Sequence, residues 1–281
     1  MKTKNALLTT CLSLFMLVAY SQKDKIKGSK NVTVHETDID AFNRIVVGEK
    51  FKIDLIEGSE ASVYIEADDN LHDVIQFEVV DSSLVFSTNM RITTSRKMSI
   101  KVTYTNALRQ IETIENGQVS SLTSLNIDDL VLVHTGNSKA FLNVKSSKFK
   151  LINSEKSKVK LNLTTNLATL ELNEGSKTEA LITADSLQVD LYQRASAKIE
   201  GETDYLNVRA DNSSTFTGKN MTATNAEVTA DLNCDVYVQV LENLSISATG
   251  NSEVYIYESP KIDLKSFSDL AKLHKKELNK N

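Results

Sequence analysis

The fold is decided by a stretch that runs from Val131 to Lys177 and reads VLVHTGNSKAFLNVKSSKFKLINSEKSKVKLNLTTNLATLELNEGSK. A short apolar segment leads through a few polar residues to a small residue, and a second short apolar segment follows. The small residues are Ser138, Ser157 and Ser176, so the same unit recurs at a constant spacing. Apolar and polar residues alternate inside each segment, which is typical of β-strands rather than helices. The stretch therefore predicts a repeat of short β-strands.

The same unit continues on both sides of this stretch. An earlier unit lies at residues 114–118, and later units reach their small residues at Ser196, Ser214, Cys234 and Ser252. The step from each small residue to the next is almost constant, with a period of about nineteen residues. Such a unit cannot bury its own apolar face, whereas stacked copies share a continuous core. We therefore predict eight parallel coils over residues 111–258, about 4.8 Å apart, in a rod on the order of 40 Å long.

The small residues are expected at a corner of each coil, where neighbouring backbones approach closely. Cys234 holds this place in its unit, so it is predicted to be a buried equivalent of serine rather than a reactive thiol. An antiparallel β-sandwich is the alternative architecture, because turn signals every 8–12 residues also suit it. The repeated order of strand, polar corner, small residue and strand favours an all-β solenoid.

The first residues predict export. Residues 1–21 are typical of a secretory signal peptide: Lys2 and Lys4 precede an apolar run, and small residues suit cleavage before Gln22. An uncleaved anchor is the alternative, but the run is shorter than the roughly 18–20 residues of a membrane span. We expect a mature chain without a membrane span, located in the periplasm, in association with the outer membrane or at the cell surface.

Three further regions flank the regular units. Residues 22–39 are expected to be a flexible N-terminal segment, and the longer alternating runs over residues 40–110 predict β-strands that begin or cap the fold. Residues 259–281 form a C-terminal tail. Over Ser266–Lys280 the apolar residues have helix-like spacing, so we expect a short amphipathic helix that covers the last coil. Recognition of a partner is the alternative role for that helix.

The charge narrows the class of partner. The formal net charge is −5, and removal of Lys2 and Lys4 lowers it to −7. An exported acidic chain without a basic patch is not expected to bind nucleic acid. The one concentrated positive stretch lies around Lys272, Lys275 and Lys276.

Several motifs together resemble a known family. They are the opening Phe42–Gly48, the strand ending Asp54–Gly58, the segment Ala67–Leu71 before Ile75, and corners such as Thr135–Ser138 and Thr249–Ser252. Over residues 40–258 the chain resembles the GIN-domain family of auto-transporter adhesin heads, exported proteins common in Bacteroidetes. The resemblance implies a right-handed parallel β-helix at the cell envelope and no established biochemical activity. The chain departs from the family where Lys156, Arg194 and Leu232 replace the usual small corner residues.

No catalytic motif stands out, so we predict no catalytic, cofactor-binding or metal-binding residues and no cofactor. The four histidines lie in unrelated segments and are predicted to be surface or corner residues: His35, His72, His134 and His274. Two acidic pairs, Asp68-Asp69 and Asp128-Asp129, are candidates for calcium. Calcium needs six to eight oxygen ligands, and neither pair supplies them locally. Solvated turn carboxylates are the favoured interpretation.

The remaining question is whether the rod acts on a glycan or only binds a partner. Glu171, Asp190, Asn207 and Glu227 stand at similar places in successive units, and a row of them would suit a lyase or glycosidase. They are also the ordinary polar half of alternating strands, and the chain has no tryptophan to stack on sugars. We therefore predict a non-catalytic, adhesin-like scaffold that presents flat β-faces to an envelope protein or a glycan. A polysaccharide-active enzyme and a periplasmic sensing or assembly module are the alternatives; the sequence does not specify the oligomeric state.

Overall fold

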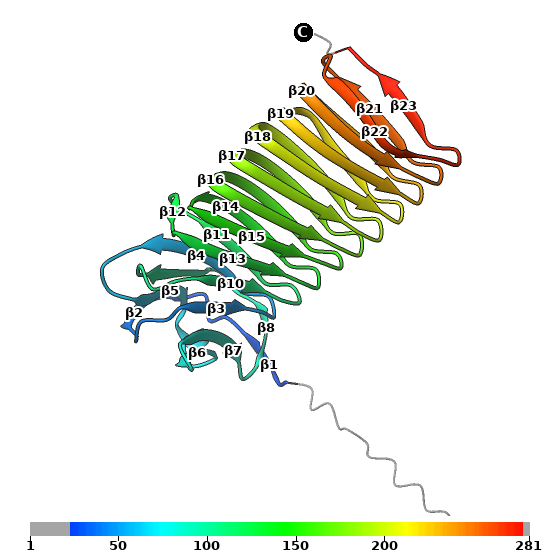
Figure 1. The fold of residues 1–281 in the computed structure, drawn as a ribbon. Coiled ribbons are helices and arrows are strands. Elements are labelled where there is room, and N and C mark those ends of the chain that lie inside the picture. The colour runs from blue at the N-terminus through cyan, green and yellow to red at the C-terminus, as the bar shows by residue number, and fades with distance from the viewer. Residues whose placement is uncertain (1–22, 278–281) are drawn as a thin grey trace, which may run out of the picture.

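The repeat folds into a stack of parallel coils (Figure 1). The computed structural model describes residues 23–277, so the predicted signal peptide lies outside the described residues. Lys158 pairs in parallel with Lys177, and the Lys177 N–H donates to the Ser157 carbonyl at 3.0 Å. Ser157 and Ser176 are therefore stacked neighbours. The predicted β-solenoid, with its coils of about nineteen residues, is confirmed. Its right-handed sense stays a prediction.

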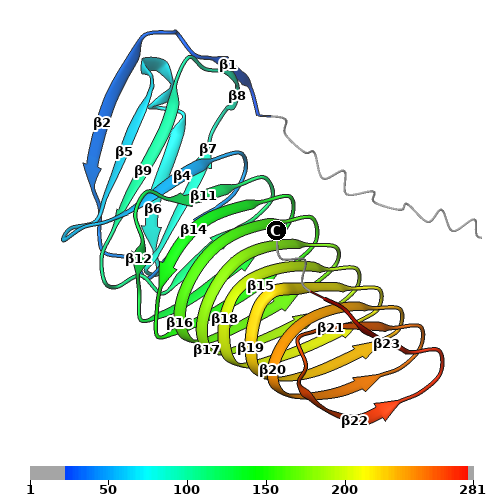
Figure 2. The same ribbon diagram turned by 90° about the horizontal axis from the view of Figure 1, so that it is seen from above.

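Each coil is flattened and has two faces, which Figure 2 shows as nested loops. The first face contains β3 (Arg44–Val47), β10 (Gln110–Thr113), β13 (Asp129–His134), β15 (Lys148–Asn153) and β22 (Lys261–Phe267). The second face contains β4 (Lys52–Glu57), β11 (Gln118–Ser121), β12 (Leu125–Asn126), β14 (Lys139–Lys145), β21 (Glu253–Tyr257) and β23 (Lys272–Lys275). Five longer strands start on the second face and end on the first: β16 (Lys158–Leu172), β17 (Lys177–Leu191), β18 (Ser196–Asp211), β19 (Thr215–Asp231) and β20 (Asp235–Ala248).

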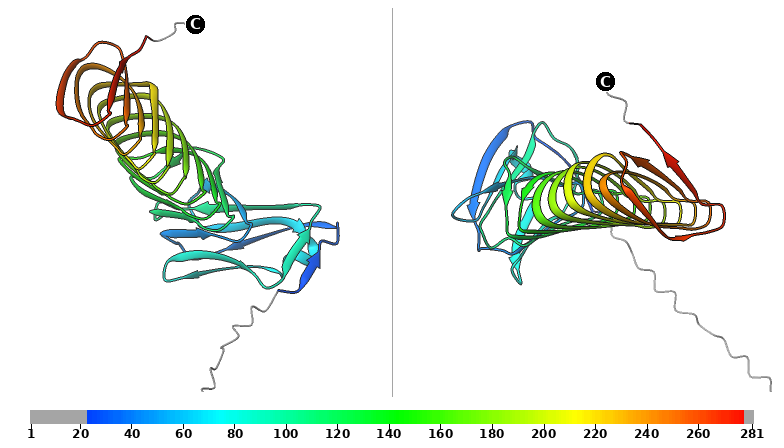
Figure 3. Two further views of the ribbon diagram at one scale, coloured as in Figure 1. Left: turned by 90° about the vertical axis from the view of Figure 1, so that its right-hand side faces the viewer. Right: turned by 45° about the horizontal axis from the view of Figure 1, so that its top comes forward.

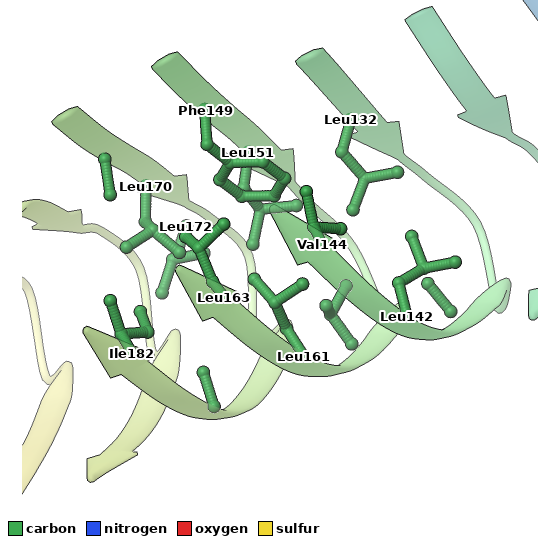
Figure 4. Packing of buried hydrophobic residues seen from close by; sticks show 14 of the residues in the cluster. Leu132, Leu142, Val144, Phe149, Leu151, Leu161, Leu163, Leu170, Leu172 and Ile182 are labelled. Atoms are coloured by element: carbon green, nitrogen blue, oxygen red, sulfur yellow. The ribbon is translucent and has the colours of Figure 1, made fainter. Parts of the chain in front are cut away.

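The alternation seen in the sequence separates core from surface. In β14 every second residue is buried, and the exposed residues between them point to solvent. Leu132, Leu151 and Leu170 occupy one position in three successive coils and stack inside the rod (Figure 4). Full burial of a side chain of this size contributes about 1.5–3 kcal/mol. Since every coil repeats these positions, the core runs continuously between the two faces.

The predicted column of small residues lies at one corner of the coils and is buried. Ser157 Oγ donates to the Ser154 carbonyl at 2.5 Å, and Cys234 Sγ makes the same contact with the Asp231 carbonyl at 3.0 Å. Cys234 is fully buried and burial raises the pKa of its thiol, so its serine-like role is confirmed. Ser196 was misplaced by one residue, because the residue aligned with Ser176 is Ala195.

The corners also contain residues with positive φ, a conformation that is strained for side chains with a Cβ. Gly136 and Gly250 have φ of 73° and 66° at this corner. Arg194 and Leu232 adopt φ of 69° and 56° in the equivalent turns. Two of the three departures from small residues, Arg194 and Leu232, are therefore accommodated at the cost of local backbone strain, whereas at the third the residue before Lys156, Glu155, has the positive φ of 63°.

The N-terminal strands close one end of the solenoid. They are β1 (Lys25–Lys27), β2 (Val32–Asp38), β5 (Ser62–Asp68), β6 (Ile75–Val80), β7 (Ser83–Thr88), β8 (Arg91–Thr94) and β9 (Met98–Tyr104). β7 and β9 lie beneath β3 and β4, and antiparallel β6, β5 and β2 extend them outward. Two of the expected boundaries change. Residues 22–39 contain β1 and β2 instead of a flexible segment, and coils begin at β3 rather than at residue 111.

The predicted C-terminal helix is wrong. Residues 261–275 form β22 and β23, which pair in parallel with β20 and β21 and make one more coil. The only helical segment of residues 23–277 is the single 3₁₀ turn η1 (Asp69–Leu71). Phe267 and Leu273 belong to two strands on opposite faces, and Leu270 and Ala271 to the corner between them. Their helix-like spacing therefore reflects a corner, because backbone pairing to the previous coil outweighs weak helical periodicity.

Candidate functional site

The second face carries a row of lysines at the centre of the rod. Lys139, Lys158 and Lys177 occupy the same position on β14, β16 and β17. All three side chains are exposed, and neighbouring strands bring them about 4.8 Å apart. Among the described residues, none of the three has a carboxylate within ion-pair distance. We call these three residues the lysine row.

The surroundings of the lysine row are mixed in character. Lys160, two residues beyond Lys158 on the same strand, pairs with Glu179 at 3.1 Å. Phe141 and Leu181 are exposed large apolar residues on this face. A shallow groove of about 310 Å³ runs beside them, lined in part by Asn162 and Lys198. Clustered like charges repel one another in the free protein, so an anionic partner would relieve repulsion here.

Beyond the lysine row, the same face carries an aromatic ladder. Tyr237, Tyr255 and His274 follow one another on β20, β21 and β23, with centroid separations of 4.3 and 4.6 Å. The rings lie nearly parallel, at 4° and 13°. Each ring therefore covers the face of its neighbour, which leaves mainly edges for a ligand. The ladder stabilises the coil stack more readily than it supports stacking on sugars.

Glu253 binds the last coil to the one before it. Lys272 Nζ donates to this carboxylate at 2.8 Å, His274 Nε2 lies 3.0 Å from it, and the Tyr255 hydroxyl donates at 2.5 Å. The contact with Lys272 is the main cause that lowers the pKa of Glu253 to about 2. The hydrogen bond to Glu253 raises the pKa of Tyr255. These groups form a closed ionic and hydrogen-bonded cluster at the second face.

The acidic stripe considered from the sequence does not form one row. Glu171 aligns with Asp190, whereas Asn207 aligns with Glu227 in a separate row two residues away. Glu171 also pairs with Lys150 at 2.7 Å, and Asp190 accepts from Gln188 at 2.7 Å. Glu171 and Asp190 are thus already paired with other side chains, and the four residues are divided between two rows. They do not converge on a common point as the two carboxylates of a glycosidase would.

The histidines and acidic pairs serve the fold in ways the sequence did not show. His134 is the last residue of β13, next to the corner, where it is fully buried and contacts Thr113, and burial lowers its pKa to about 3; of the two expected places, surface or corner, it takes the corner. Asp68 is also buried rather than solvated, and its carboxylate accepts the backbone N–H groups of Arg96, Lys97 and Lys30. The contact with Arg96 is the main cause that lowers its pKa. Within residues 23–277 no cluster of three or more histidine, cysteine or acidic side chains is placed to hold a metal.

A hollow of about 590 Å³ lies between the N-terminal strands and the first coil. Phe51, Ile92 and Met98 contribute apolar lining, and Lys50 and Arg91 are among its basic residues. This volume falls within the usual range of small-molecule sites. The sequence did not predict this hollow, because its lining comes from β1, β7, β8, β9 and two separate corners that only the tertiary fold brings together.

The chain matches one family model over residues 41–182 and again over 162–260, the family described as "Putative auto-transporter adhesin, head GIN domain". The protein belongs to this GIN-domain family. The expected resemblance is thereby confirmed, and membership implies export. Within residues 23–277 no helix is both long and apolar enough to cross a membrane. No curated protein matches the chain.

Solved structures support the same fold at low sequence identity. A crystal structure described as a "putative adhesin" from Parabacteroides merdae has a TM-score of 0.58 and 16% identity, covering 90% of this chain and 99% of that one. An adhesin described in the same words from Parabacteroides distasonis has a TM-score of 0.58 and 18% identity, covering 89% and 100%. A "Putative lipid binding protein" from Parabacteroides distasonis has a TM-score of 0.52 and 16% identity, covering 90% and 97%. At these identities the likeness concerns the fold alone.

Proposed function

We propose that this GIN-domain protein is a non-catalytic, adhesin-like scaffold of the cell envelope that binds an anionic partner, protein or glycan, on its second face. The lysine row is the single observation that carries the proposal. Its three lysines occupy one position on neighbouring strands, are exposed, and have no carboxylate partner among the described residues. A linear partner with regularly spaced negative charges would match this geometry over several coils.

The charge of the lysine row predicts how binding depends on salt. The chain as a whole is acidic, with a formal net charge of −5, so the lysine row is a local exception to the overall field. Exposed charges attract a partner through water, and salt screens the attraction beyond about 10 Å at 0.1 M. Binding should therefore weaken steeply with ionic strength.

The test compares the lysine row with lysines elsewhere. The triple variant Lys139→Gln, Lys158→Gln and Lys177→Gln should lose most retention on an immobilised polyuronate and most crosslinks to intact envelopes. A control triple variant at Lys27, Lys148 and Lys156 removes the same charge from scattered exposed positions and should retain both. Equal losses of binding in the two triple variants would show that binding depends only on the net charge of the protein. Full binding by the lysine-row variant would overturn the proposal.

A second candidate function rests on the hollow beside the first coil. Its apolar lining, with four basic residues against the two acidic residues Glu49 and Glu115, suits a small amphipathic anion. The lipid-binding description of one protein of similar fold is consistent with this role. A fluorescent fatty acid should then bind the wild-type protein, and Met98→Trp should fill the hollow and block it. Unchanged binding by Met98→Trp would place the fatty acid elsewhere.

A further inference from the structure

The C-terminal end of the rod exposes residues that every earlier coil buries. Ile262, Leu264 and Phe267 of β22 align with Leu244, Ile246 and Ala248 of β20. Their exposed fractions are 43, 49 and 40%, whereas those of the β20 residues are 1, 0 and 0%. Leu270, at the following corner, is 69% exposed. Within residues 23–277, the core of the solenoid therefore ends as an open apolar patch without a cap.

The backbone at this end is open as well. Within residues 23–277, β22 pairs only with β20 and β23 pairs only with β21. Both strands thus have one edge of N–H and C=O groups without a partner strand, and Figure 3 shows the last coil at the free end of the rod. An exposed strand edge is a ready template for another strand.

We propose that this end is a docking site for an extended segment of a partner protein that pairs with β22 and carries apolar residues alternating with carboxylates. The apolar residues would cover Ile262, Leu264 and Phe267, as the next coil does elsewhere in the rod. Backbone hydrogen bonds along β22 would supply affinity, and the alternating side chains would supply selectivity. This site is separate from the lysine row and does not depend on it.

The charges of the last coil select the carboxylates. β22, β23 and the residue after them carry five lysines: Lys261, Lys265, Lys272, Lys275 and Lys276. Asp263 and Glu253 already pair with Lys265 and Lys272. Of the other three lysines, only Lys261 lies on β22, and it has no carboxylate within ion-pair distance among the described residues. Lys275 and Lys276 lie on or directly after β23, on the opposite face, and add positive charge to this end of the rod. An acidic strand would therefore gain an ion pair with Lys261 that a neutral strand would not.

The lysines and the unpaired backbone edge disfavour two other occupants. A second copy docked end to end would bring two lysine-rich edges together, and like charges directly opposite destabilise a strand pair. A lipid surface would cover the apolar patch but leave the edge N–H and C=O groups without partners in the hydrocarbon region. A strand satisfies the apolar, backbone and charged groups at once.

The test uses the mature chain and three labelled synthetic nine-residue peptides: alternating valine and glutamate, alternating valine and lysine, and the acidic composition in scrambled order. Fluorescence anisotropy should show binding of the alternating acidic peptide, weakened by salt. Leu264→Asp should reduce its affinity by about ten-fold or more, a loss of about 1.4 kcal/mol. Leu167→Asp, at a residue 43% exposed on the first face and away from the lysine row, should bind like wild type.

Each other outcome overturns the proposal. Equal binding of all three peptides would show that the site selects neither the charge nor the alternation of the peptide. Absence of binding by any peptide would show that this end is not a strand-docking site. A concentration-dependent dimer that Leu264→Asp abolishes would identify a second copy as the occupant. Peptide binding only after removal of residues 278–281 would identify that segment as the natural cover. Circular dichroism and the melting temperature check that both aspartate variants are folded.

Discussion

The two ends of the solenoid differ in how far they bury the inward residues of their last strands. At the N-terminal end, the inward residues of β7 and β9, such as Leu84 and Val102, are fully buried, because antiparallel β6, β5 and β2 extend both sheets beyond the coils. At the C-terminal end, β22 and β23 continue the parallel pattern and then stop; the inward residues of β22 are exposed, and Leu273 of β23 is only half-buried. Stacking of parallel coils therefore does not by itself cover the core at the ends of the rod. A change of strand direction closes one end, and the other end stays open among the described residues.

The largest expected effect is a difference in the free energy of unfolding between substitutions at the two ends. Leu84→Asp places a charge in the closed end and should cost about 4 kcal/mol or more, since it removes a buried side chain and buries a carboxylate. Leu264→Asp at the open end should cost less than about 1 kcal/mol, because the residue is already half exposed. Urea denaturation followed by circular dichroism measures both. Similar costs would mean that the C-terminal end is covered in solution.

A smaller difference is expected at the corner column. Ser176→Phe should cost about 3 kcal/mol or more, because the buried corner between two coils has no room for a ring. Ala271 aligns with Ser252 in the same column but belongs to the last coil, whose Lys272 N–H donates to the Ser252 carbonyl. Ala271→Phe should therefore be tolerated. Thermal melting compares the two, and wild-type stability of Ser176→Phe would place that side chain outside the core.

The stability of the last coil is expected to depend on pH through Glu253. The pKa of Glu253 is lowered from 4.5 to about 2, mainly by Lys272. A lowered pKa in the folded state means that its contribution is complete above pH 4.5 and disappears as the pH falls toward 2. The protection of the β23 amides against hydrogen exchange, corrected for the intrinsic exchange rate at each pH, should fall over this range in the wild type.

Glu253→Gln is the matched control for that experiment. Its β23 amides should exchange faster already at neutral pH, with little further change in acid. An acid response that persists in Glu253→Gln would assign it to another carboxylate, such as Asp68 at the closed end, whose pKa is also lowered.

The smallest expected effect concerns the backbone of the corners near the open end. Leu232 has φ of 56° and its side chain is exposed, so Leu232→Gly should relieve strain and stabilise the protein by about 1 kcal/mol or less. Gly250→Ala, at φ of 66° in the next coil, should destabilise it by a similar amount. Melting temperatures test the pair. A destabilising Leu232→Gly would show that its side chain contributes contacts that outweigh the strain.

Sequence periodicity predicted much of the fold because the repeat is local. The spacing of the serines located the coils, and Cys234 was placed correctly among them. Ser196 was chosen instead of Ala195 because both are small, and only strand register distinguishes neighbours along a chain. The candidate site was harder to predict. Lys139, Lys158 and Lys177 each directly follow a serine of the corner column, so the period itself could have revealed the lysine row.

Other features depended on contacts that the local pattern does not contain. His134 and Asp68 look like ordinary polar residues in the sequence, yet both are buried and hydrogen-bonded to distant segments. The same holds for the C-terminal tail, where apolar residues suited a helix but pair as strands with the preceding coil.

By itself, the sequence determined the β-strand character, the coil length and the inward positions, because alternation and period are properties of neighbouring residues. Only the tertiary structure decided how each end of the rod terminates. Closure at the N-terminal end requires β6, β5 and β2 to run antiparallel to strands far along the chain, and such long-range pairings leave no local signal. The tertiary structure likewise exposed Ile262 and Leu264, because their burial depends on a next coil and not on their own sequence.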